Sequence, residues 1–441
     1  MMKKLTLTNL FSVFAVAGIV FLSSCKDDKT CVGVVCPDGF TVNDKCKCIK
    51  DTDTLSANIV EKTGFITADE TWTADNIYKL TGKVVVNDGV TLTIKPGTII
   101  KGQVGSGTLA SALLIARGGK LNATGSADKP IIMTSINDNI TVGQTAGTNL
   151  DEADTGLWGG LLILGKAPCS FEGDVESFQI EGIPPEDDFG LYGGTDPNDN
   201  SGIIQYVSIR HGGAIIGANN EINGLTLGGV GSGTTIDHVE VVANADDGIE
   251  FFGGTVNASE LLVWAHKDDG LDIDQAYSGT ISNSIVAQGN DSDHALEIDG
   301  PEGSASGSYT LNNVTLKGNA NKGEYADYRK AATGNNNNIF AYDFNNDADV
   351  ELDNNGVAQS FLDGVLTFSG WEIVGYDHNI FKEKVKKDDE GNPLEQVIIL
   401  DPNFTERAKT WTTKKVSIGN QTIGANMQEF DWTYAKAKGA I

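Results

Sequence analysis

The sequence of 441 residues has few positive charges. It contains 32 Lys and Arg residues against 60 Asp and Glu residues, which gives a formal net charge of -28 at pH 7. A protein that binds nucleic acid by neutralising phosphates needs a basic face. The shortage of positive charge therefore argues against nucleic acid as a partner, and we expect none.

Proline is also scarce, at 10 residues, and aromatic residues make up only 7% of the chain. Glycine is plentiful, with 53 residues, but it does not recur with the three-residue period of collagen. Hydrophobic residues make up 40%, which is too many for a chain that is disordered throughout. These proportions favour a folded chain with many turns and an extended core.

The apolar run near the amino terminus is too short for a membrane-spanning helix. It covers residues 10–22, a stretch of 13 residues, whereas a spanning helix needs about 20. Lys3 and Lys4 precede it and supply the positive start of an export signal. We therefore predict that the chain is exported rather than held by a membrane-spanning helix.

The end of this segment resembles the lipobox of bacterial lipoproteins. Residues 22–25 read Leu-Ser-Ser-Cys, and the resemblance implies a signal peptide over residues 1–24 and a lipid on Cys25. Residues 26–28, Lys-Asp-Asp, are similar to the export tag of surface-exposed Bacteroidota lipoproteins. Acyl chains hold a protein at a membrane by about 0.8 kcal/mol per buried CH₂. We expect anchoring through Cys25 to outer-membrane lipid, facing the cell exterior; an ordinary cleavage site beside a chance cysteine is the alternative.

Four cysteines follow within 18 residues and suggest a small stapled segment in an oxidising compartment. Four cysteines allow three pairings, and a zinc site is a further alternative. The spacing resembles half of an EGF-like module, which implies the pairs Cys31–Cys46 and Cys36–Cys48. We interpret residues 25–58 as a Cys-rich tether, and the remaining Cys169 as a small buried hydrophobe.

The body of the chain carries a repeat. The pattern apolar-x-x-apolar-x-apolar begins at residues 204, 236, 258, 281 and 311, so the starts are 32, 22, 23 and 30 residues apart. A basic turn of 22–23 residues with inserted loops is typical of stacked β-coils, whereas a sandwich would show closely spaced hairpins. The sequence predicts an all-β, right-handed parallel β-helix (a solenoid) with loop insertions over residues 59–375. We expect a carboxyl-terminal cap with insertions over residues 376–441.

Several phrases in the body resemble β-helical surface lipoproteins of Bacteroidota. More distantly, the coils look like pectate-lyase and polygalacturonase solenoids of the pectin-lyase-like superfamily. The resemblance implies fold and location, and it brings no established activity. The matching phrases cover residues 71–78, 92–98, 158–160, 192–196 and 223–228.

Acidic residues recur at matching places in successive coils. Equivalent positions on stacked strands lie about 4.8 Å apart, and two carboxylates at that distance repel by about 3.5 kcal/mol at an effective dielectric constant of 20. A bound cation would relieve the repulsion, and Ca²⁺ accepts six to eight oxygens in irregular geometry. Stacked Asp-Asp-Gly turns, or catalytic carboxylates, are the alternatives. The metal-site candidates are Asp246, Asp247, Glu250, Asp268, Asp269, Asp272, Asp291 and Asp293, with Asp274, Glu297 and Asp299 as further carboxylates.

Aromatic rings could offer faces to neutral sugars. We take Trp264, Tyr277 and His266 as the ligand-binding candidates, although rings that fill the corners of the coils are the plainer interpretation. An enzyme would need different residues. A hydrolase would use Asp246, Asp247 and Asp269 as acid and base, with His211 or His266 as partners; a lyase would use Ca²⁺ with Arg210 or Lys267 as the base.

These observations predict a surface-exposed lipoprotein that binds extracellular glycan or a partner protein, with Ca²⁺ bridging the acidic residues. A polysaccharide lyase or glycoside hydrolase is the second hypothesis, disfavoured because an anionic substrate would meet an acidic face. A structural stalk or adhesin without a small ligand is the third.

Overall fold

The computed structural model describes residues 40–42, 47–50, 58–184, 187–215, 222–375, 378–384, 400–415 and 417–441. The predicted signal peptide, Cys25, Cys31, Cys36 and Cys46 lie outside these residues, and only the backbone of Cys48 is described. Contacts divide the chain into two units, Met1–Ser56 and Ala57–Ile441. In the first unit, β1 (Phe40–Val42) pairs with β2 (Cys48–Lys50) as an antiparallel hairpin.

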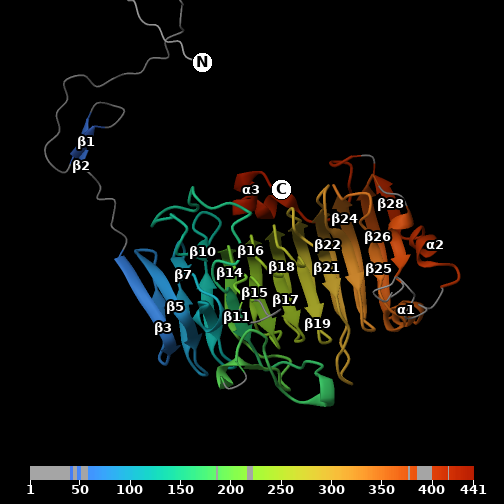
Figure 1. Ribbon diagram of the computed structural model, residues 1–441, viewed down its shortest axis with the longest axis horizontal. Helices are drawn as coiled ribbons and strands as arrows, with labels where there is room; N and C mark the ends of the chain where they lie inside the picture. The colour runs from blue at the N-terminus through green and yellow to red at the C-terminus, as the bar shows by residue number, and fades with distance from the viewer. Residues whose placement is uncertain are drawn as a thin grey trace, which may run out of the picture. The chain divides into compact units, whose positions relative to one another are not determined.

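The second unit is a right-handed parallel β-helix, in which each full coil crosses three parallel sheets. Figure 1 shows the strands stacked side by side from β3 to β28. The repeat of the sequence is confirmed by the strand pairing. Ile204 lies beside Ile236, which lies beside Ala258, and the same column continues to Ile281 and Leu311.

Long strands bend and contribute to two sheets each. They are β3 (Asn58–Ile66), β5 (Asn76–Val86), β14 (Gly202–Arg210), β16 (Thr235–Val242), β18 (Ala258–Trp264), β20 (Thr280–Ala287), β22 (Tyr309–Lys317), β24 (Gly334–Tyr342) and β26 (Leu366–Val374).

We call the residues before the bend of a strand its first arm and those after the bend its second arm. Sheet I contains the first arms of the bent strands from β14 onward. These are preceded by β4 (Glu70–Trp72), β6 (Thr91–Ile94) and β9 (Lys120–Thr124). Sheet II contains the second arms of those strands, the first arms of β3 and β5, and β7 (Ile99–Gly102), β10 (Ile131–Ser135) and β28 (Thr412–Lys415).

Sheet III begins with the second arms of β3 and β5. Its other strands are β8 (Ala112–Ile115), β11 (Leu161–Leu164), β15 (Leu225–Gly228), β17 (Ile249–Phe252), β19 (Leu271–Asp274), β21 (His294–Ile298), β23 (Glu324–Tyr328), β25 (Val350–Leu352) and β27 (Phe381–Glu383). The core is the apolar interior that the three sheets enclose.

The bend between sheet I and sheet II has one cause, repeated from coil to coil. One residue in each bent strand from β14 to β24 has a φ between 47° and 57°, in the left-handed region. This conformation interrupts the alternation of the strand and turns the chain, and asparagine tolerates it better than most residues. The residues at this position are Tyr206, His238, Glu260, Asn283, Asn313 and Asn338.

The predicted end of the coil at residue 375 is too early. Strands β27 and β28 pair in parallel with β25 and β26, so the solenoid continues to Lys415. Two short helices, α1 (Asn355–Leu362) and α2 (Phe404–Ala408), pack aromatic side chains against these last coils. The single-turn helix η4 (His378–Ile380) precedes β27.

Residues 417–441, which we name the C-terminal strap, run back along sheet II instead of capping the end. The strap contains η5 (Met427–Phe430) and α3 (Tyr434–Lys438). Glu240 accepts hydrogen bonds from the backbone of Tyr434 and Ala435, 3.1 and 2.7 Å away. The strap covers apolar side chains on the outer face of sheet II, among them Val242, Leu262 and Ile285.

An insertion over residues 165–200 covers part of the outer face of sheet III. It contains η2 (Glu172–Asp174), β12 (Phe178–Gln179), η3 (Asp188–Gly190) and β13 (Leu191–Tyr192), while η1 (Gly107–Leu109) lies in an earlier loop. Cys169 lies in the insertion, partly buried in this apolar cluster, and burial raises the pKa of its thiol to about 12. The prediction of a small hydrophobic side chain fits this environment.

Candidate functional site: an acidic cleft on sheet III

A row of acidic side chains crosses the outer face of sheet III, and we name it the carboxylate ladder. Each member is the middle residue of an apolar-acid-apolar triplet, such as Ile249-Glu250-Phe251. Strand alternation buries the apolar neighbours inside and turns the acid outward. The ladder consists of Glu250, Asp272, Glu297, Asp327 and Glu351, which pair in register on consecutive strands of the sheet.

A cleft of about 570 Å³ opens over the first rungs of the ladder. Three of its carboxylates come from strands of sheet III, four come from the turns between sheet II and sheet III, and Glu181 comes from the insertion. Lys267 is the one cation among the described residues that line it. The lining residues are Glu181, Ala245, Asp246, Asp247, Glu250, Lys267, Asp268, Asp269, Asp272 and Glu297.

Two groups of three carboxylates meet in this acidic cleft. In each group, one oxygen from each residue lies within 4.8 Å of the others. The first group joins Asp246, Asp247 and Asp268, and the second joins Asp247, Glu250 and Asp272. Asp247 belongs to both groups, so the two form one continuous set of oxygen ligands.

The second group is buried although it lines a cleft. The exposed fractions of Asp247, Glu250 and Asp272 are 7%, 6% and 8%. Burial, and then repulsion by neighbouring carboxylates, raises the pKa of all three well above the ordinary value. Asp272 Oδ1 is buried and has no hydrogen-bond partner among the described residues. A divalent cation would satisfy this oxygen and relieve the repulsion.

Asp269 differs from its neighbours in the cleft. Its Oδ1 accepts hydrogen bonds from the backbone N–H and from Nδ1 of His294, both at 2.8 Å. Burial alone would raise the pKa of Asp269, but His294 outweighs burial and the pKa is lowered. Burial likewise lowers the pKa of His294, and Asp269 more than reverses this and raises it to about 10. The two groups therefore form an ion pair at neutral pH.

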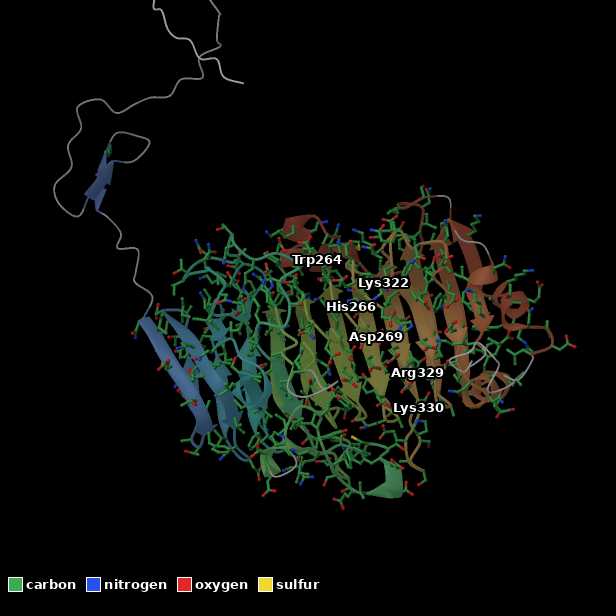
Figure 2. The ribbon with its side chains drawn as sticks, in the orientation of Figure 1. Trp264, His266, Asp269, Lys322, Arg329 and Lys330 are labelled. Carbon is green, nitrogen blue, oxygen red and sulfur yellow. The ribbon has the colours of Figure 1, made fainter. Side chains whose placement is uncertain are left out.

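From Glu297 onward, the chain supplies its own cations to the ladder. Arg329 binds Glu297 and also Asp299, whose Oδ1 lies 2.6 Å from its Nε. Lys330 Nζ lies 2.7 Å from the other oxygen of Asp299. Figure 2 shows Arg329 and Lys330 on the coils that follow the one carrying Asp269.

The last rungs have cations as well. Lys384 Nζ lies 2.7 Å from Glu351 and 3.9 Å from Asp327. Lys382, which pairs in register with Glu351, binds Asp349. The ladder thus has two halves. The carboxylates of Glu250 and Asp272 face one another in the cleft, whereas the rungs from Glu297 onward have cations, although Glu297 also lines the cleft.

Six of the eight metal-site candidates from the sequence line the cleft, and two do not. The turn between Ala287 and Leu296 has two more residues than the turn between Trp264 and Leu271, which pair with them in register. The longer turn places His294 where the previous coil has Asp269. Asp291 is exposed on a separate small pocket beside His266, and Asp293 donates its backbone N–H to Asp268 O without reaching the cleft.

The ligand-binding candidates are wrong as sugar-stacking surfaces because they are buried. Tyr277 is 1% exposed, lies in the interior of the coils and donates its hydroxyl to Val256 O. Trp264 is 9% exposed and packs under the strap against Tyr434. His266 is 1% exposed, and its Nε2 lies 3.2 Å from His294 O. The interpretation that the rings fill space in the coils is the correct one here.

Two of the catalytic partners considered for an enzyme also have structural roles. Arg210 is buried beneath the strap, where it binds Thr145 O and stacks over the ring of Tyr434. His211 is buried, and its Nδ1 lies 2.7 Å from Asp154 O. Neither lines the acidic cleft, so a proton-abstracting base there would have to be Lys267.

The pectate-lyase-like β-helix domain matches residues 64–434, which is most of the chain. The protein belongs to this family. No curated protein and no solved structure matches it. Among the residues that the structure describes, no helix has the length and apolar character needed to cross a membrane. Family membership establishes the pectate-lyase-like coil, and the chemistry of the cleft has to be argued from the residues themselves.

Proposed function

We propose that this β-helix is a lipid-anchored, surface-exposed binding protein whose acidic cleft holds Ca²⁺ and, through it, an extracellular glycan. The observation that carries the proposal is the buried Oδ1 of Asp272, which has no hydrogen-bond partner among the described residues and belongs to a carboxylate grouped with Asp247 and Glu250. The anchoring part rests on Cys25 and the residues around it.

Calcium fits the ligands that the cleft offers. Asp246, Asp247, Glu250, Asp268 and Asp272 provide oxygen only, which suits a hard cation that takes six to eight oxygens. The cleft is open on the outer face of sheet III, so a bound ion keeps positions that ligand oxygens can fill. Hydroxyl or carboxylate oxygens of a glycan are suitable donors, and the cation removes the repulsion that an acidic face exerts on an anionic sugar.

Calcium titration of chelator-treated protein tests the metal. We expect wild type to bind Ca²⁺ and Asp272→Asn to bind it at least tenfold more weakly. Asp88→Asn is the matched control, because the side chain of Asp88 is 76% exposed and lies outside the cleft. Unchanged binding in Asp272→Asn would remove the cleft from the proposal.

A glycan array with Ca²⁺ and with chelator tests the ligand. Binding that requires both Ca²⁺ and Asp272 supports the proposal. If the protein binds calcium but no glycan on the array, the ion only stabilises the fold, and a partner protein becomes the expected ligand.

A glycoside hydrolase is the second candidate, because two carboxyl groups of the cleft have pKa values displaced in opposite directions. Asp247 has a raised pKa and suits a general acid, whereas the lowered pKa of Asp269 suits a general base. Incubation with a panel of polysaccharides tests this activity. New reducing ends that disappear in Asp247→Asn would establish a hydrolase, and an unsaturated product would point to a lyase.

A further inference from the structure

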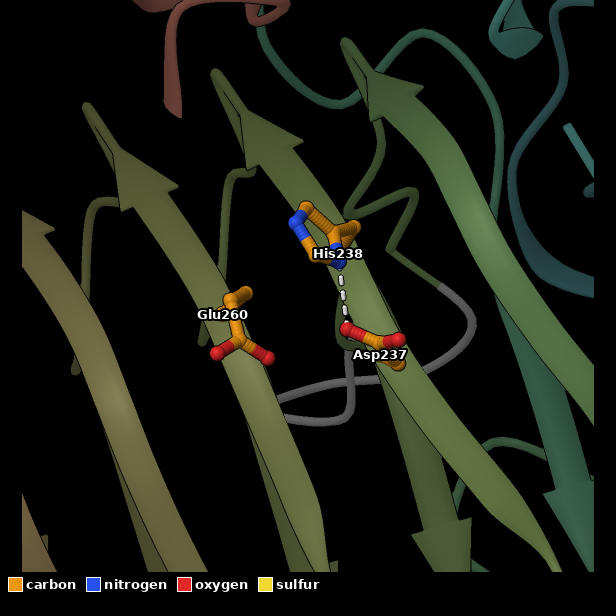
Figure 3. A group of neighbouring side chains, drawn as sticks. All are labelled: Asp237, His238 and Glu260. Atoms are coloured by element: carbon orange, nitrogen blue, oxygen red, sulfur yellow. Dashed lines mark hydrogen bonds and ion pairs between the residues drawn. The ribbon is translucent and has the colours of Figure 1, made fainter. Parts of the chain in front are cut away.

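A second group of metal-ligating side chains lies at the bend between sheet I and sheet II. It consists of Asp237 and His238 on β16 and Glu260 on β18 (Figure 3). None of these residues lines the acidic cleft. The left-handed φ of His238, 50°, interrupts the strand alternation, so that His238 and its neighbour Asp237 lie on the same side. Glu260 occupies the equivalent bend position of the next coil.

The three side chains converge closely enough to share one ion. One ligand atom from each lies within 4.8 Å of the others, and His238 Nδ1 is hydrogen-bonded to Asp237 Oδ1. His238 is 9% exposed, whereas Asp237 and Glu260 are half-buried and reachable from solvent. Zinc bonds of about 2.0–2.2 Å would bring such atoms to about 3.4 Å from one another, a change within reach of side-chain rotation.

The other edge of the imidazole has the environment of a metal-ligating histidine. His238 Nε2 is buried and has no hydrogen-bond partner among the described residues, but Glu429 Oε2 of the C-terminal strap lies 3.5 Å away. Ligating histidines commonly direct their second ring nitrogen at a carboxylate, which fixes the ring. Tyr206 adds to this by stacking on the ring at 4.3 Å, and Trp432 of the strap packs on Tyr206.

We propose that Asp237, His238 and Glu260 form a Zn²⁺ site, with His238 Nδ1 and one oxygen from each carboxylate as ligands and water in the fourth position. An imidazole with two carboxylates suits zinc, whereas the oxygen-only cleft suits Ca²⁺. Because Glu429 lies against the same imidazole, the ion holds the strap on sheet II indirectly. Zinc therefore stabilises the docked strap.

Zinc titration of the full-length protein, treated with chelator and kept in excess Ca²⁺, tests the site. We expect wild type to bind an equivalent of Zn²⁺ that His238→Asn and Glu260→Gln each bind at least tenfold more weakly, and the comparison of variants cancels any zinc held by the four cysteines of the tether. Asp431→Asn removes an exposed carboxylate of the strap and should bind like wild type. Asp272→Asn should also bind like wild type, which separates this site from the cleft.

Cobalt gives a readout that does not depend on stability. Co²⁺ in place of Zn²⁺ should show visible absorption in wild type that is lost in His238→Asn, with circular dichroism to confirm that the variant is folded. Should His238→Asn misfold, Glu260→Gln carries the test, since Glu260 is half-buried. Failure of wild type to bind zinc, or equal binding by wild type and Glu260→Gln, would overturn the proposal.

Discussion

The two halves of the carboxylate ladder have the same strand geometry and opposite charge environments. Glu250 and Asp272 pair in register as Asp327 and Glu351 do, and all four are the middle residues of apolar-acid-apolar triplets. The later rungs are accompanied by Arg329, Lys330, Lys382 and Lys384, whereas the described lining of the cleft contains Lys267 alone.

This difference shows that the fold tolerates a row of buried acids when cations accompany it. Burying a charge without a partner costs several kcal/mol, so both halves need compensation. The chain provides it internally for one half. For the other half the compensation has to come from protons or from a bound cation, and this is why the cleft is the better candidate for a binding site.

The largest effect is expected when the paired half loses its central cation. Arg329→Met removes the cation that binds the buried Glu297 and leaves Asp299 with Lys330 alone, and we expect a loss of about 3 kcal/mol in the free energy of unfolding. Urea denaturation measures it. Lys322→Met is the control, because Lys322 is exposed and its ammonium group binds the backbone carbonyl of Asp291. An equal loss of unfolding free energy in Arg329→Met and Lys322→Met would mean that the ion pairs of Arg329 do not compensate the buried carboxylates of this half.

Removal of calcium should destabilise the cleft half. At a Ca²⁺ concentration of 100 times the Kd, binding stabilises the fold by about 2.7 kcal/mol, and chelation removes this. We expect the melting temperature of wild type to fall on chelation and that of Asp272→Asn to stay constant. If the melting temperature of wild type does not change when the chelator is added, calcium does not bind at this site.

Without calcium, the cleft should make the fold less stable as pH rises. The pKa values of Asp247, Glu250 and Asp272 are raised in the fold, so the folded state binds more protons than the unfolded state above about pH 4. Stability is therefore greatest at low pH within this window and is lost as pH rises toward the folded pKa values.

The same reasoning predicts that the order of stability of wild type and Asp272→Asn depends on whether Ca²⁺ is present. In chelator at pH 8, Asp272→Asn should be more stable than wild type, because the amide carries no charge; in Ca²⁺ the order should reverse. Urea denaturation at pH 5 and pH 8 measures both. Asp88→Asn should show no crossover, and a wild type that gains stability from pH 5 to pH 8 in chelator would refute the assignment.

The smallest effect is expected at the far end of the ladder. Lys384 lies near three carboxylates but is 43% exposed, so water screens it. We expect Lys384→Met to cost about 1 kcal/mol. A loss as large as that of Arg329→Met would show that solvent exposure does not govern the contribution of these cations.

Much of the fold could be predicted because each repeat of the motif marks the start of one coil. The motif starts at residues 204, 236, 258, 281 and 311 are in register, and the turn acids from Asp246 to Asp269 do line one cleft. Asp327 and Glu351 also lie in apolar-acid-apolar triplets. The sequence alone does not assign them to the site, because the spacing from rung to rung varies with the length of the turns.

Other parts of the site could not be predicted, since they depend on contacts without periodicity. Tyr434 of the strap packs on Trp264 across about 170 residues of sequence, and no local pattern near Trp264 predicts this contact. The two extra residues in the turn before Leu296 replace an acid by His294 at the critical position. Asp237 and His238 share one side of β16 because the bend position is left-handed, and Glu260 occupies the same position on the paired strand β18.

The strap also constrains the order in which the protein can fold. Coils can stack as soon as their own residues are made, but Val242, Leu262 and Ile285 are covered by Phe430, Tyr434 and Ala435. The middle coils therefore present an apolar stripe until Phe430, Tyr434 and Ala435 have docked on them. A chain shortened before Phe430 leaves this stripe uncovered and should therefore aggregate more readily than the full chain.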